Sequence, residues 1–250
     1  MAAPATTSSY TVDPIAPTVV ADLQAVGACG ASDALLKLSL PDGYLSAATV
    51  PAALATPAAL DRVVVARAYT VKIVGAKDEP DTPTFTGQYV DSCPRGAAMV
   101  VSVPETAQNA IFGGLLAARA RAVGSAALVT NGRVRDVGEI SEFDFPVYAS
   151  GTSIQSAQGR TRVVAVHVPI QIGKATVNPG DVVVADANGV AVIPAARVEE
   201  VATLARTLAT VDDKCMHDII HESSSLQAAF AKHRGGAKSA AAAPAPVTTK

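Results

Sequence analysis

The sequence is poor in aromatic residues, and its acidic and basic residues nearly balance. It contains no tryptophan and only 4% aromatic residues, whereas 49% of its 250 residues are hydrophobic. A buried core must therefore consist mainly of aliphatic side chains. The formal net charge is −2, which provides no basic surface to neutralise the phosphates of a nucleic acid. We expect no nucleic-acid partner.

Cysteine is also scarce. The three cysteines, Cys29, Cys93 and Cys215, are widely spaced and form no CxxC pair, so reduced thiols in the cytoplasm are expected rather than a disulfide framework or a structural zinc site. No apolar run approaches the ~20 residues that a membrane span requires. The N-terminal residues do not combine a basic segment with an apolar one, as a secretory signal would. We expect no membrane partner.

Several catalytic motifs are missing as well. The sequence contains no GxSxG, no Walker-A loop and no GxGxxG, which excludes the motif-based arguments for a serine nucleophile, P-loop chemistry or a dinucleotide fold. Lys72 and Lys174 are the lysines near predicted strands, and neither gives support for a Schiff-base mechanism.

Strands and helices alternate along the middle of the chain, which predicts a mixed α/β domain with helices on both sides of β-sheet layers. Residues 17–234 are expected to form this domain, between a flexible tail at 1–16 and a disordered Ala/Pro-rich tail at 235–250. The predicted strands are Arg62–Gly75, Ala97–Val103, Ala126–Val129, Phe145–Ala149, Thr161–Gly173, and a hairpin of Val182–Ala185 and Val190–Ile193 around Asn188-Gly189. The predicted helices are Pro17–Val26, one capped by Ser32, one that begins at the Gly113-Gly114 pair, one from Val198 to about His217, and Ser225–His233.

The stretch 113–136, GGLLAARARAVGSAALVTNGRVRD, combines three chemical groups in one helix–strand–loop unit. The start of the helix at Gly113 leaves unpaired N–H groups that favour an anion. Arg135 offers a fork of donors for a carboxylate or an enolate. Asp136 offers a hard oxygen to a divalent cation. We therefore predict the active site here.

Each of these features also has a purely structural interpretation. The two glycines can serve close packing, and Arg135-Asp136 can be an ordinary surface ion pair worth ~0–1 kcal/mol. Arg133 alternates with Arg135 and is expected to face solvent or a subunit contact. Outside this stretch, Asp181 and Asp186 are expected to stabilise turns, and His167 to be an ordinary sheet residue.

The run 113–136, followed by FPVYASGTS and VNPGDVVVADANGVAVIP, resembles the RraA-like family. This family contains 4-hydroxy-4-methyl-2-oxoglutarate/4-carboxy-4-hydroxy-2-oxoadipate aldolases and regulators of ribonuclease activity. The similarity extends upstream through SDALLKL, ARAYTVKIVG and SVPETAQNAIFGG, and downstream to DDKCMHDI and FAKHRG, which are similar to fungal-type members. It covers residues from about 20 to 235.

The resemblance implies a class II pyruvate aldolase with an α/β/α sandwich of the phosphohistidine-domain type, assembled as trimers or hexamers. By this resemblance, the backbone amides of Gly113, Gly114, Leu115 and Leu116 hold the pyruvyl carboxylate of a 2-oxo acid substrate. Arg135 stabilises the enolate, and Asp136 binds Mg²⁺ or Mn²⁺ directly. Oxaloacetate decarboxylation, which passes through the same enolate, is an expected second activity.

The chain departs from the family pattern at Gly114, where aldolase members often have Asp or Glu to orient metal-bound water. This departure leaves the general base unassigned. A further carboxylate from a neighbouring subunit corresponds loosely to Asp212 or Asp213. The resemblance also allows a second class of function, a non-catalytic binding protein like the ribonuclease regulators, in which Arg135 and Asp136 serve structure alone.

Overall fold

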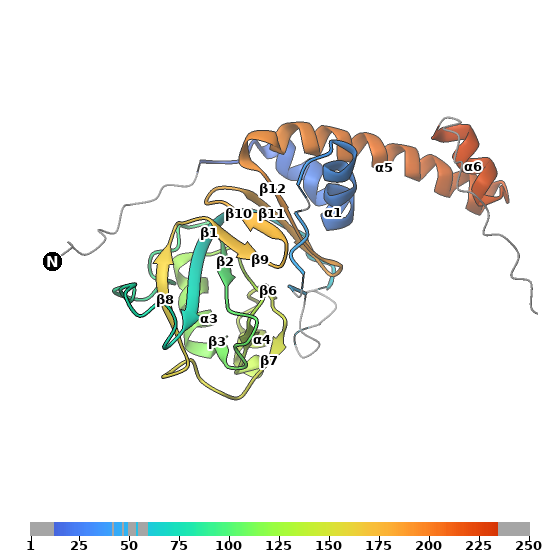
Figure 1. Cartoon of the computed structure of the whole chain (residues 1–250). Coiled ribbons are helices and arrows are strands. Elements are labelled where there is room, and N and C mark those ends of the chain that lie inside the picture. Colours follow the sequence, from blue (N-terminus) through green and yellow to red (C-terminus); the bar gives the residue numbers. More distant parts are fainter. Residues whose placement is uncertain (1–12, 42, 47, 50–53, 55–59, 235–250) are drawn as a thin grey trace, which may run out of the picture. The chain divides into compact units, whose positions relative to one another are not determined.

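The computed structural model describes residues 13–234, except 42, 47, 50–53 and 55–59 (Figure 1). The chain divides into two compact units, Met1–Arg206 and Thr207–Lys250. The predicted tail at 235–250 and most of the predicted tail at 1–16 lie outside the described residues. Each unit is considered by itself below.

A seven-stranded sheet forms the centre of the first unit, with β1 in its middle (Figure 1). The first residues of β1 pair with β11 in antiparallel orientation, its centre pairs with β2 in parallel, and its end pairs with β8 in antiparallel orientation. The strand order is β12-β11-β1-β2-β4-β6, and β8 lies off this path. The strands are β1 (Val64–Gly75), β2 (Ala98–Ser102), β4 (Ala127–Thr130), β6 (Val147–Tyr148), β8 (Thr161–Val166), β11 (Val182–Asp186) and β12 (Gly189–Ile193).

The sheet separates two hydrophobic clusters, because alternate residues of each strand point to opposite faces. On β1, Tyr69 and Val71 belong to one cluster and Ala66 and Ala68 to the other. The first cluster also contains residues of a small parallel sheet, β3-β5-β7, formed by Ala110–Phe112, Arg133–Val134 and Gly151–Thr152. The second contains residues of the antiparallel pair β9 (Ile170–Ile172) and β10 (Ala175–Val177).

Helices lie against this sheet assembly. The helix α1 (Pro17–Lys37) packs on β11 and β12. The helix α3 (Gly114–Val123) buries Ala117 and Ala120 in the first cluster, and the short helix α4 (Val137–Glu142) packs beside it. A 3₁₀ turn, η2 (Ala195–Arg197), leads into α5 (Val198–His221). The predicted α/β fold class is therefore confirmed.

Three sequence predictions need correction. Pro17–Val26 and the helix expected to start at Ser32 form one helix, α1, with non-helical backbone at Gly27 (φ 66°, ψ −171°). The strand predicted at Thr161–Gly173 is two strands, β8 and β9, because the chain turns at His167 (φ 57°). The predicted strands do not include β3, which is too short to leave a periodic pattern.

The helix α1 also corrects the expectation about membrane spans. By length and composition alone it is apolar enough to cross a membrane. Its buried side chains, among them Leu23 and Leu35, pack on β11 and β12. The break at Gly27 interrupts its backbone hydrogen bonding.

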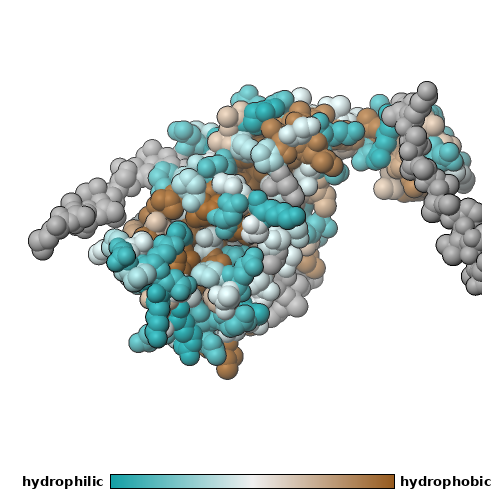
Figure 2. All heavy atoms as spheres, in the orientation of Figure 1, coloured by the Kyte–Doolittle hydropathy of each residue, from teal (hydrophilic) through white to brown (hydrophobic). Residues whose placement is uncertain are grey.

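The second unit contains the end of α5 and the helix α6 (Leu226–His233). The Ser225 hydroxyl accepts a hydrogen bond from the backbone N–H of Ala228, as an N-cap residue does. In the face shown in Figure 2, hydrophobic residues gather in patches between hydrophilic ones. The exposed large apolar side chains of this unit are Met216, Ile220 and Leu226.

Candidate active site

The candidate site lies where β3 leads into α3. Gly113 is the N-cap residue of α3 and has extended backbone (φ −155°, ψ −170°). Because glycine has no side chain, the helix start has no side-chain cap. Ala117 donates to the Gly113 carbonyl and starts the helical ladder. A helix start without a capping side chain keeps its first N–H groups available to another partner.

The loop after β4 is held rigidly against β2. The Asn131 side chain forms a pair of hydrogen bonds with the backbone of Val103, each of 2.8 Å. The Thr130 hydroxyl donates to the Val101 carbonyl at 2.8 Å and accepts from the Gly132 N–H at 2.9 Å. Because both polar side chains bond to backbone, they fix the path of the chain toward Arg135.

Arg135 and Asp136 follow β5 directly. The backbone N–H of Arg135 donates to the Phe112 carbonyl at 2.9 Å, which joins this segment to the end of β3. Asp136 has left-handed backbone (φ 56°, ψ 41°), an uncommon conformation that concentrates at functional sites. Although Asp136 stands at the N-cap of α4, its side chain does not cap that helix.

The Asp136 carboxylate instead faces the start of α3. Its Oδ2 accepts a hydrogen bond from the Gly114 N–H at 3.1 Å and lies 3.3 Å from the Arg135 Nε. The two side chains remain 43% and 37% exposed for Arg135 and Asp136, respectively. The charged groups are therefore held in place while still open to a ligand.

Gly113 is required by this close approach. A Cβ atom at Gly113 would lie 2.5 Å from the Asp136 Oδ2 and 3.1 Å from the Arg135 Cγ. Since any residue can adopt the extended backbone of Gly113, the requirement for glycine comes from the neighbouring side chains and not from the dihedral angles.

Gly114 makes room for a residue that the sequence analysis missed, Glu139. A Cβ atom at Gly114 would collide with the Glu139 Oε2, and it would lie 2.7 Å from the Glu139 Cδ. The carboxylate of Glu139 thus occupies the space where a side chain at position 114 would begin. Glu139 stands three residues after Asp136, in the first turn of α4.

These groups line one cleft of about 620 Å³. The cleft collects Gly113, Leu115, Leu116, Arg135 and Asp136, all named from the sequence, together with Glu139. Its remaining lining residues are Gln88, Ala110, Ile111, Phe112, Ser156 and Ala157.

The first amides of α3 are not equivalent. The Gly114 N–H already donates to Asp136 and the Ala117 N–H to Gly113. The N–H groups of Leu115 and Leu116 lie between these two in the sequence, among the first N–H groups of α3, which have no carbonyl partner within the helix. They are the amides of α3 best placed to receive an anionic group.

A buried tyrosine pair supports the floor of the cleft. The Tyr89 hydroxyl donates to the Ile111 carbonyl at 3.2 Å, and the Tyr69 hydroxyl donates to the Tyr89 carbonyl at 3.2 Å. Burial raises the pKa of both phenols well above their ordinary value, so they stay neutral donors that hold β3 in position.

The other residues considered from the sequence lie elsewhere. Arg133 donates to the Thr152 carbonyl at 3.3 Å and does not line the cleft. The carboxylates of Asp181 and Asp186 accept from the backbone N–H groups of Asn178 and Asn188, respectively, which confirms their predicted turn roles. Asp213 belongs to the second unit, and its role at the site stays a prediction.

The donor set of the cleft suits a hard divalent cation. The Asp136 Oδ2 contacts Gly114 and Arg135, so Oδ1 is the oxygen of this carboxylate that is available to a cation. Glu139 adds a second carboxylate to the lining of the cleft. Mg²⁺ prefers oxygen ligands, keeps several waters and needs only one or two carboxylates. No cysteine or histidine is among the described residues that line the cleft.

Comparison with known proteins gives the family. The family model described as RraA-like, Aldolase/RraA, matches residues 28–192, which is more than half of the chain. The chain belongs to the RraA-like family. A relative from Halalkalibacterium halodurans, named "Putative 4-hydroxy-4-methyl-2-oxoglutarate aldolase", is 34% identical over 106 residues, which are 42% of this chain and 50% of the relative.

A second relative, protein DlpA of Legionella pneumophila, is 29% identical over 170 residues, which are 68% of this chain and 26% of the relative. The chain therefore spans about half or less of the length of these two RraA-like relatives. The name of the Halalkalibacterium halodurans relative indicates a lyase. The name of the Legionella pneumophila relative does not mention an activity.

Two solved structures extend the RraA-like comparison to the fold. An uncharacterized protein from Pseudomonas syringae superposes with a TM-score of 0.75 at 27% identity, covering 89% of this chain and 97% of that one. Streptomyces coelicolor RraAS2, described as an unusual member of the RNase ES inhibitor RraA protein family, gives a TM-score of 0.69 at 25% identity, with 80% and 97% covered. The RraA-like fold expected from the sequence is thus confirmed.

Proposed function

We propose that this RraA-like protein is a divalent-metal-dependent pyruvate aldolase. The proposed substrates are 4-hydroxy-2-oxo acids of the 4-hydroxy-4-methyl-2-oxoglutarate type, cleaved to pyruvate and a second 2-oxo acid. The observation that carries the proposal is the convergence of Arg135, Asp136, Glu139 and the start of α3 in one cleft. The names of the aldolase relatives support the same reaction class.

Each group has a role that follows from where charge develops. Cleavage of the bond between C3 and C4 leaves its electron pair on the pyruvyl fragment as an enolate. The Arg135 guanidinium provides positive charge for that enolate. The N–H groups of Leu115 and Leu116 hold the adjacent carboxylate through hydrogen bonds and the positive end of the helix dipole.

The two carboxylates divide the remaining work. Asp136 is the proposed ligand of Mg²⁺ or Mn²⁺, which, when bound, polarises the 2-oxo group as a Lewis acid. Glu139 is the proposed base, accepting the proton of the 4-hydroxyl directly or through one water as the C4 carbonyl forms. The enolate then takes a proton at C3 and leaves as pyruvate. Oxaloacetate, which loses CO₂ to give the same enolate, is a proposed second substrate.

The proposal includes the assembly and location of the protein. We propose a homotrimer or hexamer in the cytoplasm, in which a neighbouring subunit brings Asp213 to the metal-bound water. An Asp213→Asn variant that lowers turnover without changing subunit number, measured by mass photometry, supports this part. Full turnover by that variant removes Asp213 from the site and leaves the role of the cleft intact.

The direct test measures pyruvate release from 4-hydroxy-4-methyl-2-oxoglutarate and from oxaloacetate, with Mg²⁺ and with EDTA. Arg135→Ala is expected to lower kcat/KM by about 10²–10³-fold, the cost of losing one donor to a developing oxyanion. Arg133→Ala is the matched control, because Arg133 lies two residues away on the same segment and outside the cleft.

The outcomes separate the candidate functions. Metal-dependent release that falls in Arg135→Ala and persists in Arg133→Ala supports the aldolase. Release from oxaloacetate alone identifies a decarboxylase or a different aldol substrate. No release from either substrate contradicts the proposal and favours a non-catalytic binding protein.

A further inference from the structure

A second cluster of titratable side chains lies in the unit formed by the end of α5 and by α6. Three of the four histidines of the chain, His217, His221 and His233, fall in this segment of 17 residues. Asp218 stands beside them in the last turn of α5, and Glu222 follows directly after the end of this helix. The proposed aldolase reaction uses none of these residues.

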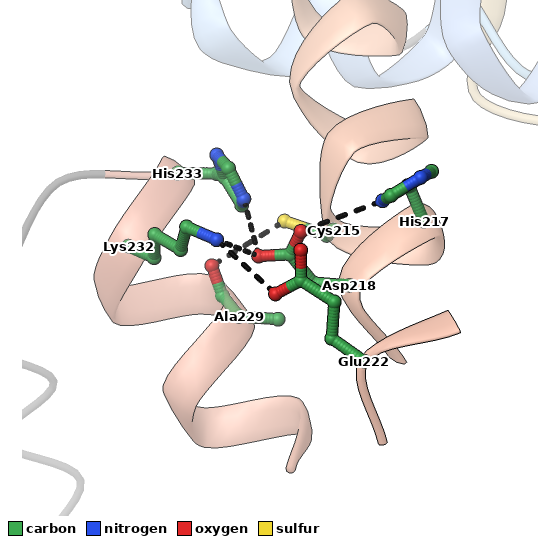
Figure 3. A network of polar contacts seen from close by, with 7 residues as sticks. All are labelled: Cys215, His217, Asp218, Glu222, Ala229, Lys232 and His233. Carbon is green, nitrogen blue, oxygen red and sulfur yellow. Dashed lines mark hydrogen bonds and ion pairs between the residues drawn. The ribbon is translucent and has the colours of Figure 1, made fainter. Parts of the chain in front are cut away.

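Two carboxylates in this cluster converge on one cation. The Lys232 Nζ lies 2.8 Å from the Asp218 Oδ2 and 3.4 Å from the Glu222 Oε2 (Figure 3). The Asp218 side chain is only 5% exposed, and its Oδ2 also lies 2.7 Å from the His233 Nε2. A buried carboxylate with these partners is held in one orientation.

An imidazole approaches the other oxygen of the Asp218 carboxylate (Figure 3). The His217 Nδ1 lies 3.7 Å from the Asp218 Oδ1, and the ligand atoms of His217, Asp218 and Glu222 all lie within 4.8 Å of one another. A tetrahedral metal ion with bonds of about 2.0–2.2 Å holds its ligand atoms about 3.3–3.6 Å apart. The His217 and Glu222 side chains, 63% and 50% exposed, are free to close this difference by rotamer adjustment.

Further nitrogen ligands are close. The His221 ring lies 4.9 Å from the His217 ring, centroid to centroid, one turn further along α5. Histidines four residues apart on a helix present their rings on one face, the spacing that zinc sites use. His233 is placed to hold Asp218 from outside, as partners of metal ligands do.

We propose that His217, Asp218 and Glu222 form a binding site for a borderline divalent transition metal such as Zn²⁺. The metal lies between these three side chains, and Lys232 gives up its contacts with Asp218 and Glu222 and moves out to solvent. A set of one imidazole and two carboxylates, with His221 nearby, favours Zn²⁺ or Co²⁺ over Mg²⁺, which prefers oxygen ligands alone. This site shares no residue with the cleft around Asp136.

The test uses Co²⁺ as a spectroscopic substitute for Zn²⁺. The full chain, without an affinity histidine tag and stripped of metal, is titrated with Co²⁺ while its visible d–d absorption is recorded. We expect intense bands typical of low coordination number, which added Zn²⁺ abolishes and excess Mg²⁺ leaves in place. Asp136→Ala is expected to keep these bands, because Asp136 lies outside the cluster.

Variants assign the bands to the cluster. His217→Ala and Glu222→Gln are expected to weaken Co²⁺ binding about 10-fold or more. Lys232→Met is expected to strengthen it, because the resident ammonium no longer competes. His167→Asn is the matched control. It removes the histidine outside the cluster, and asparagine tolerates the positive φ of that position.

Each result decides between a metal site and an ion-pair network that only holds α6 on α5. Absence of Co²⁺ bands in both the wild type and Lys232→Met overturns the proposal. In Lys232→Met the ammonium no longer contacts Asp218 and Glu222, so these carboxylates are available to the metal. Equal affinity of the wild type, His217→Ala and Glu222→Gln also overturns it. Helix content measured by circular dichroism for each variant shows whether a loss of binding comes from a loss of structure.

Discussion

Two aspartates in the first unit accept hydrogen bonds from helix N–H groups and differ in how many other contacts their carboxylates make. Asp186 is buried, its Oδ2 accepts from the Ala28 N–H at 2.8 Å, and its Oδ1 accepts from the Asn188 N–H at 2.8 Å. Asp136 is 37% exposed, leaves its own helix α4 uncapped and contacts Gly114 and Arg135 with a single oxygen. Both oxygens of the Asp186 carboxylate accept hydrogen bonds from the protein backbone. In Asp136 only Oδ2 makes such contacts, so Oδ1 is available to a ligand.

Each aspartate has its own glycine. A Cβ atom at Gly27 would lie 2.5 Å from the Asp186 Oδ2, and one at Gly113 would lie 2.5 Å from the Asp136 Oδ2. Gly27 also has positive φ, whereas Gly113 is extended. The close contact between a glycine and an aspartate therefore has a different role in the two places. At Gly27 it fixes the bend in α1, and at Gly113 it positions charged side chains in the cleft.

The largest expected effect concerns the second carboxylate of the cleft. Glu139→Gln keeps the shape of the side chain but removes the proposed base, so kcat/KM for pyruvate release should fall by about 10²–10⁴-fold. Thermal unfolding should change little, because Glu139 is exposed. Steady-state kinetics with a melting curve checks both.

An exchange of positions sharpens this result. Gly114→Asp combined with Glu139→Ala places a carboxylate at position 114 and vacates the space that Glu139 occupies. If Glu139 supplies the carboxylate that position 114 lacks, the double variant should regain activity relative to Glu139→Ala alone. A double variant as inactive as Glu139→Ala would separate the two positions functionally.

Gly113→Ala is expected to lower kcat/KM by about 10²-fold, because displacement of the Asp136 carboxylate by about 1 Å misplaces the site. The backbone at Gly113 suits alanine, so the free energy of unfolding should stay close to that of the wild type. A loss of stability in proportion to the loss of activity would show that Gly113 serves packing alone.

Asp186→Ala should have the opposite profile. It leaves the buried N–H of Ala28 without its acceptor, which costs about 1–3 kcal/mol in the free energy of unfolding, while kcat/KM per folded molecule stays near the wild-type value. Urea unfolding and kinetics on the same preparation test this separation. Loss of turnover in the folded fraction would contradict the contrast between the two aspartates.

The smallest effect concerns Cys29, which is exposed near Asp186. Burial raises the pKa of the Cys29 thiol, and the charges of Asp186 and Asp33 add to this effect. Alkylation by iodoacetamide should therefore be slower at neutral pH than for a free thiol. Asp33→Asn, which removes one charge, should speed it a few-fold at most, because burial is the larger cause. An unchanged rate would remove Asp33 from this account.

The central part of the site could be predicted because it is encoded in one continuous stretch. A helix start at Gly113 and a loop after a buried strand are both visible in the sequence, and they bring Arg135 and Asp136 to the first amides of α3. Gly114 and Asp136 are 22 residues apart in the sequence, so their contact is not visible there. The parallel pairing of β3 with β5 brings them together. The Arg135–Asp136 pair lies in a cleft and not on an open surface.

Glu139 could not be predicted with the same argument. It stands on a helix of six residues, too short for a periodic pattern, and its importance appears only because its carboxylate fills the space beside Gly114. The sequence signal that points to Glu139 is its spacing of three residues from Asp136. The strands β3, β5 and β7 were missed for a similar reason, since two or three residues cannot show an alternation.

The bends at Gly27 and His167 also could not be predicted from the sequence. Gly27 lies within a run that reads as helix on both sides, and the acceptor that caps the second part, Asp186, comes from 158 residues further along the chain. His167 interrupts a β-rich run with positive φ, where its N–H donates to the Thr70 carbonyl at 2.7 Å. In both cases a tertiary partner decides the backbone, and local propensity does not.

The measurement that tests the account most directly compares Asp136→Ala with Asp186→Ala in one assay of pyruvate release, with Mg²⁺ and with EDTA. The account predicts metal-dependent release by the wild type and by folded Asp186→Ala, and release by Asp136→Ala that is no higher than in EDTA. Wild-type turnover by Asp136→Ala in the presence of Mg²⁺ would contradict it.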